Sequence, residues 1–306
     1  MKVTTTATKT ATDIKNVPQA LTIVSRAQID DQQLRSIGDL LLFVPGASYN
    51  SGEGNRDTLV LRGNSSTADF FVDGVRDDVQ YFRDFYNVDR VEVLKGPNAM
   101  IFGRGGGGGI INRVTKEAIF MPLRELSWTG GSNANRRFTA DLNQPLTGRI
   151  AARLNGMYEN SDSFRNYVNL ERYGVHPSLT FAASNNTGIT LAYERFHDGR
   201  VADRGITSFQ GAPAPVDISI YYGNPDASHV RADVNLASAA IDHRAGKFSV
   251  QNRVSFADYD RDYQNFVPGA VNSAKTLVAL SAYNNASGRR NFFNQTNMVR
   301  AMLNSI

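Results

Sequence analysis

The chain has 306 residues, a formal net charge of +4 and no cysteine. The lack of cysteine excludes disulfides, Cys-ligated zinc, iron–sulfur clusters and thiol nucleophiles. Basic and acidic residues balance between Lys15 and Lys116, and the small positive excess is scattered over the rest of the chain, so we expect no nucleic acid among its partners.

Residues 1–14 are rich in Thr and Ala and show no periodicity, so we expect a disordered tail. The start of the chain lacks the apolar segment of a signal peptide, and its end lacks the aromatic strand that is typical of the end of an outer-membrane barrel. We therefore expect a fragment of a longer protein. The apolar run at 40–44 is far shorter than the ~20 residues that a membrane-spanning helix needs.

From residue 16 the pattern predicts a small α+β domain. It begins with a strand at 21–24 and a helix at 26–33, for which Ser25 is the expected N-cap. A second short helix at 36–44 is stopped by Pro45. The loops rich in Gly, Asn and Ser are expected at 48–57 and 63–67, and the further strands at 58–62, 69–72, 90–94 and 110–114.

After Pro122 apolar and polar residues alternate over long segments, which is typical of strands that cross a bilayer. Short turns alternate with long connections, as in outer-membrane barrels. A soluble β-sandwich fits less well, because its strands are usually shorter. The expected long loops are 160–174, 198–231 and 262–289, and the expected strands are 123–130, 136–145, 149–159, 175–183, 188–197, 232–244, 247–261 and 290–302.

A run of five glycines at 105–109 stands between two predicted strands. A phosphate-binding loop would instead place its glycines between a strand and a helix. Glycine permits a tight backbone crossing in a crowded interior, although a flexible surface loop is the plainer alternative. The segment resembles the plug-domain signature of TonB-dependent outer-membrane receptors, carried here by Lys95, Gly96, Pro97, Phe102, Gly103, Gly105, Gly106, Gly108, Gly109 and Asn112.

Further segments resemble the same family in the same order. They are residues 16–25 (NVPQALTIVS), 40–46 (LLLFVPG), 59–63 (LVLRG) and 70–75 (FFVDGV), and residues 138–146 and 153–158 resemble its first barrel hairpin. Residues 72–84 are most similar to the catecholate-siderophore branch. The resemblance implies an α+β plug domain at 15–118 followed at 119–306 by antiparallel transmembrane strands of an incomplete 22-stranded β-barrel, of which about eight are present.

The resemblance also implies a function. The receptor would lie in the outer membrane of a Gram-negative bacterium and import ferric siderophores into the periplasm, energised by TonB. Its partners would be TonB, the ferric siderophore and outer-membrane lipid. Because the sequence offers no cluster of oxygen ligands, and its four histidines are scattered, we expect no cofactor and no protein-held metal; iron would arrive already chelated. We expect the fragment alone to be inactive as a transporter, because an open sheet leaves unpaired strand edges.

The family's outward loops between plug strands correspond to residues 50–56, 64–67 and 76–84. Arginine donates charge-assisted hydrogen bonds to an anionic chelate, and tyrosine offers a flat face with a polar tip. The predicted ligand contacts are therefore Arg56, Arg76, Gln80, Tyr81 and Arg83. The alternative is a solvated turn with incidental charge neighbours.

Arg62 and Lys95 are predicted to latch the plug to carboxylates of the barrel beyond residue 306, as the family pairs such positions. No catalytic residue is expected, since the sequence has no nucleophile elbow, zinc spacing or nucleotide fingerprint in its proper context. Two other functions stay open: a passive porin, and a receptor of the same family for cobalamin, a nickel chelate or an oligosaccharide.

Overall fold

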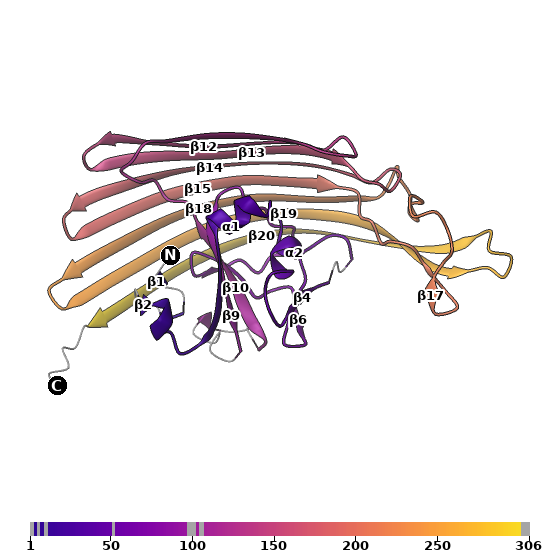
Figure 1. Cartoon of the computed structure of the whole chain (residues 1–306), viewed down its shortest axis with the longest axis horizontal. Coiled ribbons are helices and arrows are strands. Elements are labelled where there is room, and N and C mark those ends of the chain that lie inside the picture. The colour runs from indigo at the N-terminus through magenta and orange to yellow at the C-terminus, as the bar shows by residue number, and fades with distance from the viewer. Residues whose placement is uncertain are drawn as a thin grey trace.

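The computed structural model describes residues 3–4, 7–8, 12–50, 53–96, 102–103 and 107–300. A sheet of long antiparallel strands arches over a smaller mixed domain that lies on its concave side (Figure 1). We call the domain before residue 119 the plug and the long-stranded sheet the wall. Among the described residues no helix is both long and apolar enough to cross a bilayer.

The plug begins with β3 (Ala20–Ser25), which leads directly into α1 (Arg26–Asp31). The Ser25 side chain accepts a hydrogen bond from the Gln28 amide, which confirms the predicted N-cap. Helix α2 (Ile37–Leu41) starts with a capping box in which Ser36 and Asp39 satisfy each other's backbone amides. The apolar residues of α2 are buried in the plug core.

Five strands form the central sheet of the plug, in the order β3-β9-β10-β7-β8. Strand β10 (Gly109–Thr115) pairs antiparallel with β9 (Val88–Lys95) and parallel with β7 (Phe70–Val72), and β8 (Val75–Arg76) lies at the edge. A second sheet contains β4 (Ala47–Tyr49), β5 (Leu59–Leu61) and β6 (Asn64–Ser66). Two of these strands fall in segments predicted as loops, so that prediction was wrong at 48–49 and 64–66.

The N-terminal tail also departs from its prediction, since part of it is ordered. Strand β1 (Val3–Thr4) pairs with β2 (Thr12–Asp13), and a short 3-10 helix, η1 (Ile14–Asn16), follows. Ala7 is fully buried in a cluster with Leu94 and Ile110, and Thr4 Oγ1 donates to Glu92 Oε2 at 2.6 Å. Tertiary contacts with the plug therefore supply the order that the composition alone does not.

The wall has eight strands in sequence order, which confirms the predicted antiparallel sheet. Within the described residues it does not close, and β11 and β20 are its two edges. A short hairpin, β16 (Ser208–Phe209) with β17 (Ala212–Pro213), lies in the long connection before β18. The strands are β11 (Leu123–Gly130), β12 (Arg136–Thr147), β13 (Ile150–Asp162), β14 (Asn169–Ser184), β15 (Thr187–Arg200), β18 (His229–Ala245), β19 (Phe248–Val271) and β20 (Val278–Arg300).

The short turns of the wall lie at one end of the sheet and the long connections at the other (Figure 1). The predicted loop at 262–289 is wrong for most of its length, because β19 and β20 stay paired from Phe248 to Val271. The two strands of a hairpin that extends beyond the bilayer satisfy each other's backbone hydrogen bonds. Polar side chains in this region therefore do not end the strands.

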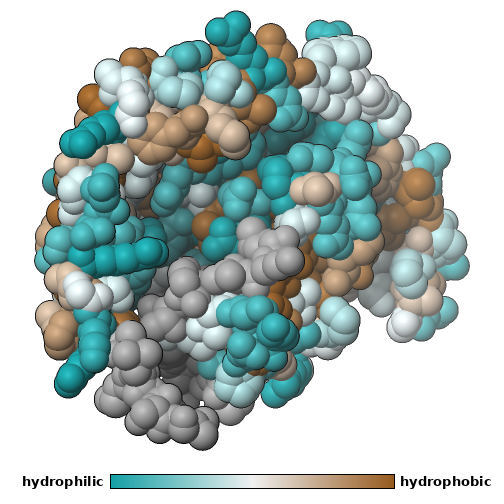
Figure 2. Space-filling model, turned by 60° about the vertical axis from the view of Figure 1, so that its left-hand side comes forward, coloured by the Kyte–Doolittle hydropathy of each residue, from teal (hydrophilic) through white to brown (hydrophobic). Residues whose placement is uncertain are grey.

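Side chains alternate between the two faces of the wall. On the convex face Trp128, Phe138, Tyr158 and Tyr173 occupy one row of paired positions across four strands and are all exposed. On the concave face hydrophilic residues line the recess above the plug (Figure 2). Apolar-out and polar-in alternation is the pattern of an outer-membrane barrel.

Candidate ligand site and plug–wall contacts

The loop between β8 and β9 folds around the side chain of Arg83, which is completely buried. Its Nη2 donates to the carbonyl oxygens of Asp77 and Val79 at 2.9 and 2.7 Å, and its Nη1 donates to that of Tyr81 at 3.1 Å. The guanidinium also stacks 4.0 Å from the ring centroid of Phe70. All of these contacts are internal, so the prediction that Arg83 contacts a ligand is corrected: Arg83 organises the loop.

Asp77 is the hub of this buried network. Its Oδ2 accepts from Arg83 Nε at 2.9 Å and from Arg113 Nη2, on β10, at 2.7 Å. Burial acts to raise the pKa of Asp77, but the two guanidinium charges outweigh it and hold that pKa below its usual value. The wall joins the network through Tyr259, whose hydroxyl donates to Asp77 Oδ1 at 3.2 Å.

Tyr81 belongs to the same network. Its hydroxyl donates to Asp77 at 2.9 Å, and its ring lies 4.3 Å from the Arg83 guanidinium. Only 4% of the residue is exposed, and burial raises the pKa of its phenol. The predicted flat face for a ligand is therefore covered, and the structure assigns Tyr81 to packing between the plug and the wall.

The other three predicted ligand contacts are partly exposed but lie in different surroundings. Arg56 Nη1 contacts Glu53 at 2.6 Å near the long connections of the wall. Gln80 donates to Thr67 Oγ1 at 3.0 Å. Arg76 lines a cavity between the plug and the wall, and its Nη2 has no hydrogen-bond partner. The structure brings Tyr81 and Arg83 together, whereas Arg56 and Arg76 stand apart from that pair.

The predicted latch residues make their observed contacts within the plug. Lys95 Nζ donates to Thr22 Oγ1 and to the carbonyl oxygen of Pro45, each at 3.1 Å. Arg62 is exposed, and its Nη1 lies against Gly96, where an added Cβ would meet it at 2.6 Å. A barrel partner beyond residue 306 stays a prediction.

The glycine signature is a close crossing of backbones. A Cβ on Gly108 would lie 2.3 Å from the carbonyl oxygen of Leu61, and one on Gly109 would lie 2.3 Å from that of Leu94. Asn112 Oδ1 accepts from the Gly74 amide at 2.9 Å. Phe102 packs edge-on against Phe71, Gly96 and Gly103 have positive φ, and Pro97, Gly105 and Gly106 lie outside the described residues.

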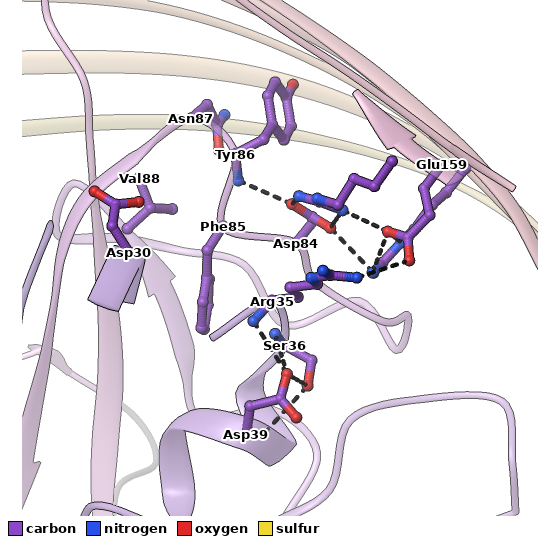
Figure 3. Close-up of polar contacts among 12 residues, drawn as sticks. Asp30, Arg35, Ser36, Asp39, Asp84, Phe85, Tyr86, Asn87, Val88 and Glu159 are labelled. Atoms are coloured by element: carbon purple, nitrogen blue, oxygen red, sulfur yellow. Dashed lines mark hydrogen bonds and ion pairs between the residues drawn. The ribbon is translucent and has the colours of Figure 1, made fainter. Parts of the chain in front are cut away.

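Sequence reasoning missed the ion pairs that join the plug to the wall. The largest cluster surrounds Asp84, which contacts Arg137 of β12 at 2.7 Å and Arg172 of β14 at 3.1 Å. Figure 3 shows Asp84 of the plug and Glu159 of the wall facing each other across these contacts. Glu159 of β13 lies between those two arginines and also faces Arg35 of the plug at 3.6 Å. Arg137, Glu159 and Arg172 occupy paired positions on the inward face, so strand register is the signal that could have found them.

Three further contacts extend this interface. Lys116 of the plug contacts Asp141 of β12 at 2.9 Å, and Asp78 contacts Arg289 of β20 at 3.0 Å. Asn87 Nδ2 donates to Glu194 of β15 at 2.9 Å. Both signs of charge occur on each side. In the Lys116–Asp141 and Asp84–Arg137 pairs mutual neutralisation is what allows the charges to be buried, whereas Arg289 stays half exposed.

Comparison with known proteins follows the same division into plug and wall. Residues 13–110 match the family model described as TonB-dependent Receptor Plug Domain. The probable TonB-dependent siderophore receptor PiuA of Acinetobacter baumannii is 29% identical over 261 residues, which cover 81% of this chain and 35% of that receptor. Its crystal structure superimposes with a TM-score of 0.90 and 26% identity, over 96% of this chain and 44% of that one.

Two other relatives match a similar stretch. The catecholate siderophore receptor Fiu of Escherichia coli K12 is 31% identical over 82% of this chain and 31% of its own length. The metal-pseudopaline receptor CntO of Pseudomonas aeruginosa is 31% identical over 78% of this chain and 35% of its own length. The chain thus spans about a third of the length of these relatives, all of which are named as receptors and none as an enzyme. It belongs to the TonB-dependent receptors of the outer membrane, of which it carries the plug and the first strands of the barrel.

Proposed function

We propose that the receptor containing this chain imports ferric siderophores across the outer membrane into the periplasm, driven by TonB. The observation that carries the proposal is a plug fixed by buried charges to the concave face of a barrel wall, in a chain that resembles the siderophore receptors PiuA and Fiu. A plug blocks free diffusion, so passage needs an energy source that displaces it.

Iron enters this proposal as cargo and not as a resident cofactor. The remaining candidates for contact with the chelate are Arg56, Arg76 and Gln80, whose side chains are partly exposed. Guanidinium groups favour anionic oxygen-rich ligands, because each N–H donor forms a charge-assisted hydrogen bond. The convex aromatic row of the wall would contact outer-membrane lipid.

A different metal chelate is the second candidate cargo, and the similarity to the metal-pseudopaline receptor supports it. Cobalamin and oligosaccharide have no such support among these relatives. The buried contacts between plug and wall argue against a passive porin, whose lumen must stay open to solutes.

Binding to the purified receptor that contains this chain would separate these cargoes. We expect quenching of intrinsic fluorescence by a ferric siderophore, at concentrations where the iron-free siderophore, cobalamin and a nickel chelate give none. Saturable binding of the nickel chelate without binding of any ferric siderophore would replace the first cargo by the second. Binding of none of them would overturn the proposal.

A further inference from the structure

The two ends of the wall carry their charges differently. At the end with the short turns four basic residues are exposed: Arg124, Arg149, Lys247 and Arg300. Arg149 and Lys247 lie in the turns that join β12 to β13 and β18 to β19, while Arg124 is the second residue of β11 and Arg300 is the last of β20. None of the four forms a salt bridge with another described residue. We call these four residues the short-turn rim.

The acidic side chains near this rim lie on the concave side of the wall. Glu117 and Glu125 line cavities between the plug and the wall. Asp242 lies two residues beyond Ala240, which lines the same cavity as Glu117, so alternation along β18 places Asp242 on the concave face too. Among the described wall residues near the rim none on the convex face is acidic, so the rim keeps its positive charge there.

At the opposite end of the wall basic side chains of the convex face are paired with aspartates. Arg231 Nε contacts Asp233 at 2.7 Å, and Arg195 contacts the same carboxylate. Arg290 Nε lies 3.6 Å from Asp258 Oδ2. These three cations already have counter-ions, unlike the cations of the short-turn rim.

Apolar side chains border the short-turn rim. Phe248 follows Lys247 and is 44% exposed, and Leu146, three residues before Arg149, is 59% exposed. The Arg300 guanidinium lies 5.6 Å from the ring centroid of Phe248. Long basic side chains cover apolar surface with their methylene groups and keep the charge in the polar layer. The rim therefore lies where the hydrocarbon of the bilayer gives way to the headgroups.

We propose that the short-turn rim binds the phosphate groups of anionic phospholipids in the periplasmic leaflet. Outer-membrane barrels place their short turns on the periplasmic side of the membrane. The phosphate oxygens accept charge-assisted hydrogen bonds from guanidinium and ammonium groups, which have no counter-ion in the described part of the wall. Each basic side chain near an anionic membrane surface strengthens binding about fivefold. The inference does not depend on the cargo that the receptor carries.

The test measures which lipids contact the full-length receptor that contains this chain. Spin-labelled phosphatidylglycerol or phosphatidylcholine is added to phosphatidylcholine bilayers that hold the receptor, and electron spin resonance gives the fraction of each label that the protein immobilises. We expect the wild type to prefer phosphatidylglycerol. Arg149→Gln combined with Lys247→Gln removes two of the four rim charges and should lower that preference by about half. Added salt should reduce the preference of the wild type.

The matched control is Arg290→Gln combined with Asp258→Asn. It removes a cation and its counter-ion from the opposite end of the wall, so the net charge stays the same, and the lipid preference should not change. A second variant, Arg149→Lys combined with Lys247→Arg, keeps both charges and should prefer phosphatidylglycerol as the wild type does. If the neutralised double variant does not insert, Lys247→Gln alone carries the test, with a smaller loss expected.

An unchanged preference in the neutralised variant would overturn the proposal, and so would an equal loss in the matched control. A loss in the charge-preserving variant would trace the effect to disturbed turns and would also overturn it. Peptidoglycan is another anionic surface of the periplasm. If the neutralised variant loses sedimentation with isolated peptidoglycan while its lipid preference stays the same, the partner of the rim is that polymer and the lipid proposal is wrong.

Discussion

Asp84 of the plug and Arg137 of the wall form an enclosed ion pair, with Nη2 of the arginine 2.7 Å from Oδ1 of the aspartate. A backbone bridge between Ser36 and Asp84 ties the same loop to the start of α2. The pair therefore joins three parts of the molecule: the first helices of the plug, the loop before β9 and the barrel wall.

The first prediction concerns this pair. Asp84→Asn leaves Arg137 and Arg172 with a single carboxylate, that of Glu159, so we expect the plug to lose about 3–5 kcal/mol of stability. The readout is the denaturant concentration at which a protease gains access to the plug of the full-length receptor. Asp30→Asn is the control, because Asp30 is half exposed in its pair with Arg26 and should cost under about 1 kcal/mol. Equal shifts in the two variants would contradict the role of the buried pair.

A second prediction concerns pH. Burial outweighs the Arg83 charge and raises the pKa of Asp57 to about 6, whereas an unfolded aspartate titrates near about 4. Asp57 of the folded plug therefore binds a proton between about pH 4 and 6 that the unfolded chain does not, so Asp57 should contribute roughly 2–3 kcal/mol more to the stability of the plug at pH 4 than at pH 7. Asp84 does not oppose this trend, because Arg137 and Arg172 overcome the effect of burial and lower its pKa; its stabilisation is lost only at more acid pH.

The Arg83 amide donates to Asp57 Oδ2 at 2.9 Å. Its protection from hydrogen exchange, after correction for the intrinsic exchange rate at each pH, measures the stabilisation by protonated Asp57. Asp57→Asn should abolish the gain in protection between pH 7 and 4. If Asp57→Asn shows the same gain in protection, a group other than Asp57 causes it.

A third prediction concerns the glycine crossing. Gly109 has a φ of +145°, and its Cβ would lie 2.3 Å from the Leu94 carbonyl oxygen and 3.0 Å from the Lys95 Cα atom. Gly109→Ala must displace β9 or β10, at a cost of at least about 1–3 kcal/mol in plug stability. Gly188→Ala on β15 is the control, since nothing lies within 4 Å of its added Cβ. A stable Gly109→Ala plug, by the same protease assay, would rule out this close packing.

A fourth prediction concerns the lipid-facing surface. Leu154 lies midway along β13 on the convex face, so Leu154→Arg should cost about 2–4 kcal/mol of barrel stability in lipid vesicles. Leu277→Arg should be nearly neutral, because Leu277 is 70% exposed in the connection between β19 and β20, beyond the convex apolar surface. Urea unfolding of both variants in vesicles measures the difference. A neutral Leu154→Arg would mean that this face does not meet lipid.

The sequence predicted those helices and strands whose formation depends on residues close together in the chain. The N-cap at Ser25 and the start of α2 at Ser36 follow from side chains that satisfy free amides next to apolar helical residues. The wall strands follow from alternation with period two, because one face meets lipid and the other the plug. Strands β4 and β6 escaped prediction, since three residues with Ser and Asn carry too little pattern to distinguish a strand from a loop.

The functional residues were harder to predict, because burial is decided in three dimensions. Arg83 sits among polar loop residues, and nothing adjacent in the sequence indicates that the loop closes around it. Predicting the ion pairs between plug and wall requires knowing how three strands are aligned with one another. The alternation of apolar and polar residues along a single strand does not give this register.

The most direct test of TonB-driven transport past a fixed plug is the uptake of radiolabelled iron, supplied as a ferric siderophore, by cells that carry the full-length receptor. Matched cells with and without TonB would be compared, with binding at the cell surface subtracted by measurement in the cold. The account predicts binding in both strains and accumulation only in cells with TonB. Equal accumulation in both would mean an open pore and contradict the account, as would binding without accumulation in either strain.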